Sequence, residues 1–221
     1  MRIIYCLQNL QVEKVFEKKG IIEKEDLIIR TKEELEFEKV KQFNPDFIMF
    51  PHWSHKVEEK IISKFSCICF HSAPLPYGRG GSPIQNMIKR GFKETELCSL
   101  IMTNEFDAGP ILLRTKFKLD GSLDAILDRM YCLSADQIKK IKSEKLTPKQ
   151  QVGDVVNFKR LSQMDNELNL DRNNSEIYDQ IRMLDSEYYP NSYLKLEDKI
   201  IEFFDAKYID GVVEAKIKIK K

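Results

Sequence analysis

Short apolar runs alternate with amphipathic segments along the first part of the chain. The runs that read as strands are Arg2–Leu7, Asp26–Ile29, Asp46–Phe50 and Cys67–Phe70. Two intervening segments, Glu33–Phe43 and Lys56–Phe65, carry apolar residues at helical spacing. This alternation predicts βαβ units, and the right-handed crossover rule makes them a Rossmann-like α/β fold with a doubly wound, mostly parallel sheet.

A segment rich in proline and glycine, Leu75–Pro83, follows the fourth predicted strand and leads into a helix predicted over Ile84–Arg90. Glu96–Thr103 and Ile111–Leu119 have the apolar content of two further strands, and Leu123–Lys145 that of a long helix or helix pair. Residues 1–150 are therefore predicted to form the main α/β domain.

The pattern changes after residue 150. Val155–Arg160 is strand-like, Ser175–Leu184 is helical, and Tyr193–Lys220 alternates around turns at Glu197-Asp198 and Asp210-Gly211. Residues 151–221 are predicted to form a small β-rich C-terminal subdomain.

The last residues of the chain alternate lysine with isoleucine. This pattern in Lys216–Lys221 favours an exposed edge strand, because lysine discourages pairing between sheet edges. The apolar segment Ile200–Phe204 calls for a partner surface, so a homodimer through the C-terminal subdomain is expected.

The charge of the chain is balanced, with 36 lysine and arginine residues against 35 acidic residues. This balance is typical of solvated helix faces and argues against a nucleic-acid partner. No apolar run approaches the length that spans a bilayer, so no membrane contact is expected. The N-terminus becomes polar too early for a signal peptide, and the number of cysteines is odd, at five. Both features indicate a reduced, cytoplasmic protein.

The segment after the first predicted strand, Gln8–Gln11, contains no glycine, so an NAD-type pyrophosphate cannot approach the backbone there. Ligands of open α/β sheets bind beyond the carboxyl ends of strands, and His71 lies at such an end. Cys67, Cys69 and His71 share one face of that strand. Core cysteines with a capping histidine are the plain alternative. The three positions span too far for one tetrahedral zinc, so no metal site is predicted.

An ordered set of residues runs from the fourth predicted strand into the C-terminal subdomain. It consists of His71, Leu75, Pro76, Arg79, Gly80, Pro83, Ile84, Gln85, Asp107–Ile111, Phe158–Arg160, Ile177, Ile181, Arg182, Leu184, Tyr189 and Pro190. This set resembles the formyltransferases that use 10-formyltetrahydrofolate, which include methionyl-tRNA formyltransferase and the sugar N-formyltransferases. The resemblance covers Asp46 to Tyr193.

The resemblance implies direct transfer of a formyl group from 10-formyltetrahydrofolate to a primary amine. The sequences of Phe50–Ser54 and Tyr77–Asn86 are similar to those of the formyltransferases that are assigned to pseudaminic-acid-type sugars. The implied acceptor is then a nucleotide-linked amino sugar, UDP-4-amino-4,6-dideoxy-N-acetylaltrosamine.

The resemblance implies catalytic roles for His71, Asp107 and Cys69. An attacking amine must lose a proton while the formyl oxygen gains negative charge; His71 can serve either need near neutral pH, and Asp107 can orient the imidazole. The family's usual triad has asparagine at the place of Cys69, so a strong amide donor is replaced by a weak thiol. Ser72 or a backbone N–H then has to substitute, or the protein is slow or inactive. Covalent catalysis by Cys69 is a minor alternative.

Contacts to the folate, as implied by the resemblance, are mostly main-chain contacts from Trp53, Ser54, His55, Asn104, Glu105 and Phe106. The residues implied on the acceptor side are Ser72, Tyr77, Arg79 and Gln85. Trp53 is equally well explained as a partly buried aromatic residue, and Arg79 as a brace for its loop.

Three functions are left open. An amino-sugar N-formyltransferase agrees with the balanced charge. A methionyl-tRNA formyltransferase requires a basic surface and a complete C-terminal barrel, whereas the tail beyond Ser175 is short. A non-catalytic protein that binds folate or a nucleotide sugar would tolerate Cys69.

Overall fold

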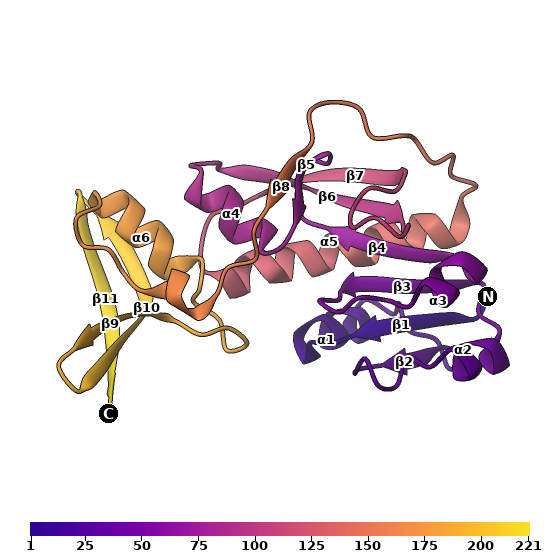
Figure 1. The fold of residues 1–221 in the computed structure, drawn as a ribbon, viewed down its shortest axis with the longest axis horizontal. Coiled ribbons are helices and arrows are strands. Elements are labelled where there is room, and N and C mark those ends of the chain that lie inside the picture. Colours follow the sequence, from indigo (N-terminus) through magenta and orange to yellow (C-terminus); the bar gives the residue numbers. More distant parts are fainter. The chain divides into compact units, whose positions relative to one another are not determined.

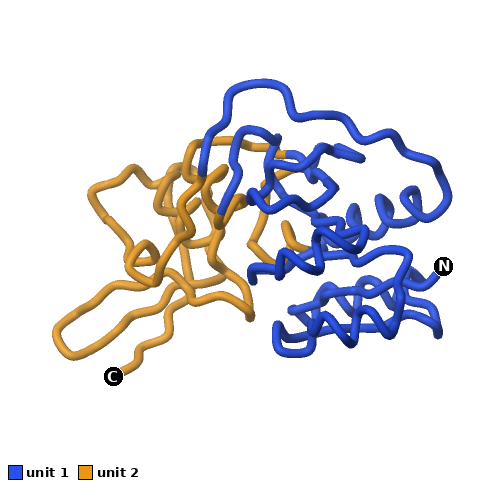
Figure 2. Tube along the Cα trace, turned by 45° about the vertical axis from the view of Figure 1, so that its right-hand side comes forward, with its two compact units in different colours: residues 1–80, 96–117, 128–157 blue, residues 81–95, 118–127, 158–221 orange.

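The computed structural model describes all residues, 1–221. By contact, the chain forms two compact units, each assembled from three segments: residues 1–80, 96–117 and 128–157 form unit 1, and residues 81–95, 118–127 and 158–221 form unit 2 (Figure 2). The division into domains 1–150 and 151–221 stays a prediction, and the units interleave along the chain.

A six-stranded sheet with the order β2-β1-β3-β4-β6-β7 organises the first part of the chain (Figure 1). Its strands are β1 (Ile3–Leu7), β2 (Leu27–Ile29), β3 (Phe47–His52), β4 (Cys67–His71), β6 (Glu94–Ile101) and β7 (Ile111–Lys118). The first four strands in this order pair in parallel, whereas β6 runs antiparallel to β4. The predicted α/β fold with a mostly parallel sheet is confirmed.

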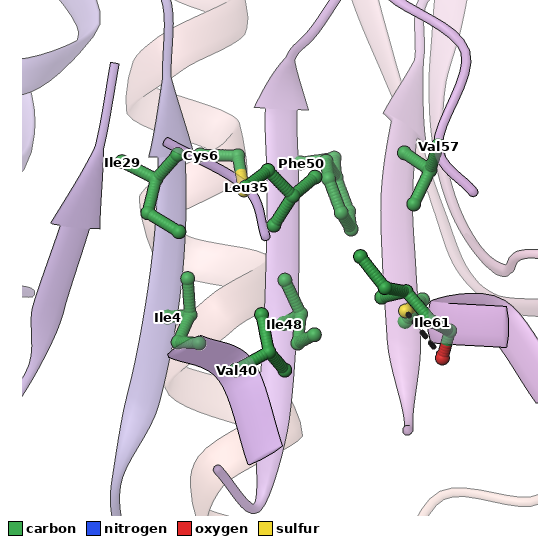
Figure 3. Packing of buried hydrophobic residues seen from close by; sticks show 10 residues of the cluster. Ile4, Cys6, Ile29, Leu35, Val40, Ile48, Phe50, Val57 and Ile61 are labelled. Atoms are coloured by element: carbon green, nitrogen blue, oxygen red, sulfur yellow. Dashed lines mark hydrogen bonds between the residues drawn. The ribbon is translucent and has the colours of Figure 1, made fainter. Parts of the chain in front are cut away.

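Helices cover both faces of this sheet. They are α1 (Leu10–Lys18), α2 (Phe37–Phe43), α3 (Glu59–Lys64) and α5 (Leu123–Ser143). On one face, Ile4 and Ile48 of the sheet pack in one buried cluster with Val40 of α2 and Ile61 of α3 (Figure 3). Because helices cover both faces, nearly all residues of the four parallel strands β1 to β4 are apolar.

The opposite face of the sheet carries α1 and α5. The ring of Tyr5 meets Phe16 of α1 edge to face, with ring centroids 6.0 Å apart. Asn9 caps α1 by accepting from the Gln11 N–H and also donates to the Tyr131 hydroxyl of α5. Helix α1 is absent from the predicted elements, although an asparagine cap is a usual sign of a helix start.

Two local differences from the predicted elements have identifiable causes. The helix predicted from Glu33 begins at Phe37, because Thr31 and Arg30 bond to Glu34 in a turn and Glu36 is extended. Within the segment rich in proline and glycine, a short strand β5 (Tyr77–Gly80) pairs with β8 (Val156–Phe158).

Unit 2 contains α4 (Pro83–Lys89), a short 3-10 helix (Gln163–Asn166), α6 (Asn174–Arg182) and an antiparallel sheet of β9 (Ser192–Leu196), β10 (Lys199–Ile209) and β11 (Val212–Lys220). The order β11-β10-β9 makes β11 an edge strand, as the lysine pattern predicts. The predicted turns at Glu197-Asp198 and Asp210-Gly211 lie between these strands.

A buried arginine holds part of unit 2 together. The Arg182 guanidinium donates to the main-chain oxygens of Leu119 and Gly121 and pairs with Asp179. Because Arg182 is 4 % exposed, these bonds replace water for a charge that lies inside the protein.

None of the helices has the length and apolar content that crossing a membrane requires.

Candidate active site

His71 is the last residue of β4 and is 7 % exposed. Its Nε2 lies 2.7 Å from the main-chain oxygen of Gly78. A carbonyl oxygen only accepts hydrogen bonds, so Nε2 carries the hydrogen and donates it. The second ring nitrogen, Nδ1, is therefore the one left for proton transfer.

Asp107 lies opposite that second nitrogen. Its Oδ1 is 3.4 Å from His71 Nδ1, and its Oδ2 accepts from the Gly80 N–H at 2.9 Å. Both side chains are largely buried, at 8 % and 17 % exposure for His71 and Asp107. The carboxylate is thus fixed by one oxygen while the other faces the imidazole, an arrangement that stabilises the charged ring.

The loop that carries Asp107 follows β6. Because β6 is antiparallel to β4, the end of β6 lies beside the start of β4, where the Met102 N–H donates to the Cys67 oxygen. The loop therefore runs back along β4 before Asp107 reaches His71 at the other end of that strand. Asp107 itself has a positive φ of 54°. At Gly109, a Cβ atom would lie 1.7 Å from the main-chain oxygen of Ile101, so only glycine fits there.

Cys69 precedes His71 on the same strand and packs against the apolar clusters on both sides of it. Burial raises the pKa of the Cys69 thiol well above its usual value, and the charge of Asp107 raises it further. A thiol held in its protonated form is a poor nucleophile and metal ligand but retains a weak S–H donor. The covalent role for Cys69 is therefore disfavoured.

Arg79 and Gln151 form a second group of contacts beside Asp107. Arg79 donates through Nε and Nη2 to Gln151 Oε1, at 3.2 and 2.9 Å, and through Nη1 to Glu105 Oε1. Gln151 Nε2 donates to the main-chain oxygens of Asp107 and Gly109. The Arg79 side chain is 12 % exposed, and each of its three nitrogens donates a hydrogen bond within the protein, which favours the brace interpretation over acceptor binding.

Three predicted folate-binding residues, Trp53, Ser54 and His55, follow the carboxyl end of β3. Gln8, just after the neighbouring β1, donates to His55 Nε2 at 2.7 Å and accepts from the N–H and hydroxyl of Ser54. The Trp53 ring lies 5.5 Å from the His55 ring, edge to face, and its buried Nε1 has no hydrogen-bond partner within the protein.

The other three, Asn104, Glu105 and Phe106, precede Asp107. Their main-chain N–H groups make no hydrogen bond within the protein, and Phe106 is 64 % exposed. The Asn104 side chain donates to Glu59 Oε1 at 2.7 Å. Since Glu59 begins α3, this bond ties the loop to the segment that follows His55.

The predicted acceptor residues belong to both units. Ser72 and Tyr77 lie in the segment after His71, and Ser72 is buried. Gln85 lies on α4 in unit 2, where it is 5 % exposed.

Sequence reasoning missed three parts of the site: the Gly78 oxygen, the Gly80 N–H and Gln151. Both glycines have positive φ, at 87° and 102°, and the glycine content of the loop is the signal that could have pointed to them. Gln151 lies in a connection between regular elements and carries no motif.

Two protein-family models and several relatives of known name match the sequence of this chain. A family model described as "Formyl transferase" matches residues 5–130, and one described as "Methionyl-tRNA formyltransferase, C-terminal domain" matches residues 163–220. Methionyl-tRNA formyltransferase of Campylobacter lari is 30% identical over 184 residues, which cover 81% of this chain and 59% of that protein. The protein of the same name from Thermodesulfovibrio yellowstonii is 25% identical over 190 residues, 82% of this chain and 61% of that protein. The chain thus spans about three fifths of these relatives.

A solved structure described as methionyl-tRNA formyltransferase from Clostridium thermocellum is 34% identical, with a TM-score of 0.93 over 100% of this chain and 99% of that chain. A 4-N formyltransferase from Francisella tularensis shares the fold at 17% identity and a TM-score of 0.66, over 89% of this chain and 93% of that one. HypX from Aquifex aeolicus, solved in complex with tetrahydrofolic acid, does so at 18% identity and a TM-score of 0.74, over 93% of this chain and 38% of that one. With a family model matched over more than half of its length, this chain belongs to the formyl transferase family.

Proposed function

We propose that this protein transfers a formyl group from 10-formyltetrahydrofolate to a primary amine. The observation that carries the proposal is the pair formed by His71 and Asp107, with Nε2 of the imidazole committed to the Gly78 oxygen and Nδ1 turned to the carboxylate. Family membership and the tetrahydrofolic acid bound by the HypX protein support the same donor.

The residues around the pair fit a folate. A pteridine presents an amide-like edge, and the N–H groups of Asn104, Glu105 and Phe106 are without partners in the protein. The exposed Phe106 ring offers a flat apolar surface, and the buried Trp53 Nε1 is an unused donor. When bound, 10-formyltetrahydrofolate supplies the formyl carbon that the amine attacks.

In this proposal the amine attacks the formyl carbon and loses a proton to His71 Nδ1. The bond between the formyl carbon and N10 of the folate then breaks, and His71 returns the proton to N10, so that tetrahydrofolate leaves and the imidazole is neutral again. A neutral ring with its hydrogen on Nε2 has a lone pair at Nδ1, and Asp107 Oδ1 stabilises the imidazolium that forms after proton uptake. This division of tasks leaves the negative charge on the formyl oxygen to other donors. Cys69 contributes a neutral S–H, which is weaker than an amide.

Methionyl-tRNA is the first candidate acceptor. The two curated relatives described above are named methionyl-tRNA formyltransferase, and the family model that matches the C-terminal residues is described as the C-terminal domain of that enzyme. The match to a chain of equal extent, described as a methionyl-tRNA formyltransferase, supports it further.

A nucleotide-linked amino sugar is the second candidate. The balanced charge of 36 basic against 35 acidic residues lacks the excess that a polyanion partner favours. A structure described as a sugar N-formyltransferase from Shewanella is also among the structural neighbours, over 98% of this chain and 96% of that one. The pseudaminic-acid type, with its altrosamine acceptor, stays a prediction within this candidate.

The test supplies purified protein with 10-formyltetrahydrofolate and, in parallel, methionyl-tRNA or a panel of UDP- and dTDP-linked amino sugars. Mass spectrometry then detects the added formyl group. Formylation that is lost in His71→Asn supports the proposal and identifies the acceptor. No product in any reaction, with folate binding retained, overturns the proposal in favour of a binding protein.

A further inference from the structure

Gln151 lies in the connection between α5 and β8, between residues 130 and 163, where neither matched family model reaches. We propose that Gln151 is a positioning residue that holds Asp107 against His71 by linking the Asp107 loop to the Arg79 guanidinium. This inference rests on the proposed function, in which His71 and Asp107 act as a pair.

The amide of Gln151 uses both of its ends. Nε2 donates to the main-chain oxygen of Asp107 at 2.7 Å and to that of Gly109 at 2.9 Å. Oε1 accepts two bonds from Arg79, at 3.2 and 2.9 Å. An amide alone among neutral side chains offers two donors and an acceptor in this flat arrangement.

These bonds close a ring of contacts around Asp107. Arg79 is followed directly by Gly80, whose N–H donates to Asp107 Oδ2 at 2.9 Å. Gln151 therefore holds the Asp107 main chain, and through Arg79 it also holds the group that fixes the Asp107 carboxylate. The remaining carboxylate oxygen is left facing His71 Nδ1 at 3.4 Å.

The Asp107 loop requires such a support. Asp107 has a positive φ of 54°, a backbone conformation that is unfavourable for residues other than glycine. The connection carrying Gln151 is itself anchored nearby, because Lys149 exchanges two main-chain bonds with Ile111 and Val156 donates to the Pro76 oxygen. The side-chain amide of Gln151 therefore contacts the Asp107 loop from a backbone that is itself held in place.

The experiment reads the imidazole nitrogens of His71 in long-range 1H–15N spectra, and the chain has only 3 histidines. His71→Asn assigns the signals, and Asp107→Asn defines how far the Nδ1 signal moves when its partner is lost. Gln151→Met should move the Nδ1 chemical shift in the same direction as Asp107→Asn and by at least half as much. Added to Asp107→Asn, it should cause no further change in that chemical shift. Gln150→Met is the matched control, since Gln150 is an exposed neighbour without a partner, and should leave Nδ1 in place.

An Nδ1 signal unmoved by Gln151→Met, or displacements that simply add in the double variant, would overturn the inference. If Gln151→Met does not fold, Gln151→Glu replaces it, because a carboxylate still accepts from Arg79 but cannot donate to the two carbonyls. In formyl transfer, Gln151→Met should lower kcat about 10- to 100-fold with little change in KM. Should the wild-type protein transfer no formyl group, the proposed function fails, while the spectra still decide the role of Gln151.

Discussion

His71 donates its Nε2 hydrogen to the main-chain oxygen of Gly78, seven residues further along the chain, at 2.7 Å. This bond selects the tautomer and the orientation of the ring before any ligand binds. It also explains why a loop rich in glycine and proline directly follows the strand that ends in histidine, since Gly78 adopts a positive φ of 87° to turn the chain back.

Removal of either member of the pair should abolish most of the formyl transfer. His71→Asn takes away the proton acceptor, and Asp107→Asn takes away the charge that stabilises the protonated ring. We expect each to lower kcat by roughly 100- to 10,000-fold. Single-turnover rates measure the loss, and unchanged thermal midpoints would show that the fold is intact. A normal rate in either variant contradicts the assigned roles.

Cys69→Asn should raise the rate. The substitution introduces an amide donor where the family's triad has one, and one such donor is worth roughly 100-fold or more in acyl transfer. We expect a gain of about tenfold, because the thiol site is packed for a smaller side chain. Steady-state rates of Cys69→Asn and Cys69→Ala give the comparison. Unchanged rates in both variants would mean that another donor already stabilises the oxygen.

Gly109→Ala should destabilise the Asp107 loop and reduce activity. The new Cβ would lie 1.7 Å from the Ile101 oxygen, so the backbone has to move. We expect a loss of about 2–4 kcal/mol in the free energy of unfolding. Gly20→Ala is the control, because Gly20 has a φ of +62° but open space around it, and it should cost only about 1 kcal/mol. Equal losses in urea denaturation would refute the steric argument.

Buried thiols should make the protein less stable in alkali. Burial raises the pKa of Cys67 from 9.0 to about 12, so above pH 9 the unfolded chain loses this proton while the folded chain keeps it. The free energy of unfolding therefore falls as the pH rises from 9 toward about 12. Cys98, with a pKa raised mainly by burial to about 11, acts in the same direction.

Cys67→Ala should make this fall less steep. Urea denaturation at a series of pH values measures the slope. Ile61→Val is the matched control, because it creates a small cavity beside Cys67, whose thiol lies 3.9 Å from the Ile61 oxygen, without removing a titrating group. It should lower stability equally at every pH. An unchanged slope in Cys67→Ala would exclude this thiol as the cause.

Arg182→Met should destabilise unit 2. The substitution leaves the Leu119 and Gly121 oxygens and the Asp179 carboxylate without their buried donor. We expect a loss of about 3–5 kcal/mol, measured by denaturation. Arg172→Met, at an exposed site, should change stability by less than about 0.5 kcal/mol. A small effect at Arg182 would mean that water replaces the guanidinium.

The strand that ends at His71 and the loop that carries Asp107 were predictable because their signals are local. A run of apolar residues identifies β4, and Asp107 stands in a short motif before Ile111. The turns at Glu197-Asp198 and Asp210-Gly211 were predictable for the same reason, since turn residues act within a few positions.

Other features depend on contacts between distant segments. The role of Gln151 arises because a connection without regular structure passes Arg79 and Asp107, and no nearby residue reveals this. The antiparallel course of β6 likewise follows from its pairing with β4 and not from its own composition, which suits either direction. The start of α2 was misplaced because the side chain of Glu34 closes a turn instead of extending the helix.

The interleaving of the two units restricts how this chain can exchange parts with its relatives. A recombination breakpoint after residue 157 keeps unit 1 whole but divides unit 2, because residues 81–95 and 118–127 stay with the upstream partner. A transplanted downstream segment then has to supply an arginine for the Leu119 oxygen and a main-chain oxygen for the Asn86 amide, which Arg182 and Lys159 provide in the native chain. Chimeras made at this breakpoint are expected to fold only where both pairings are inherited together.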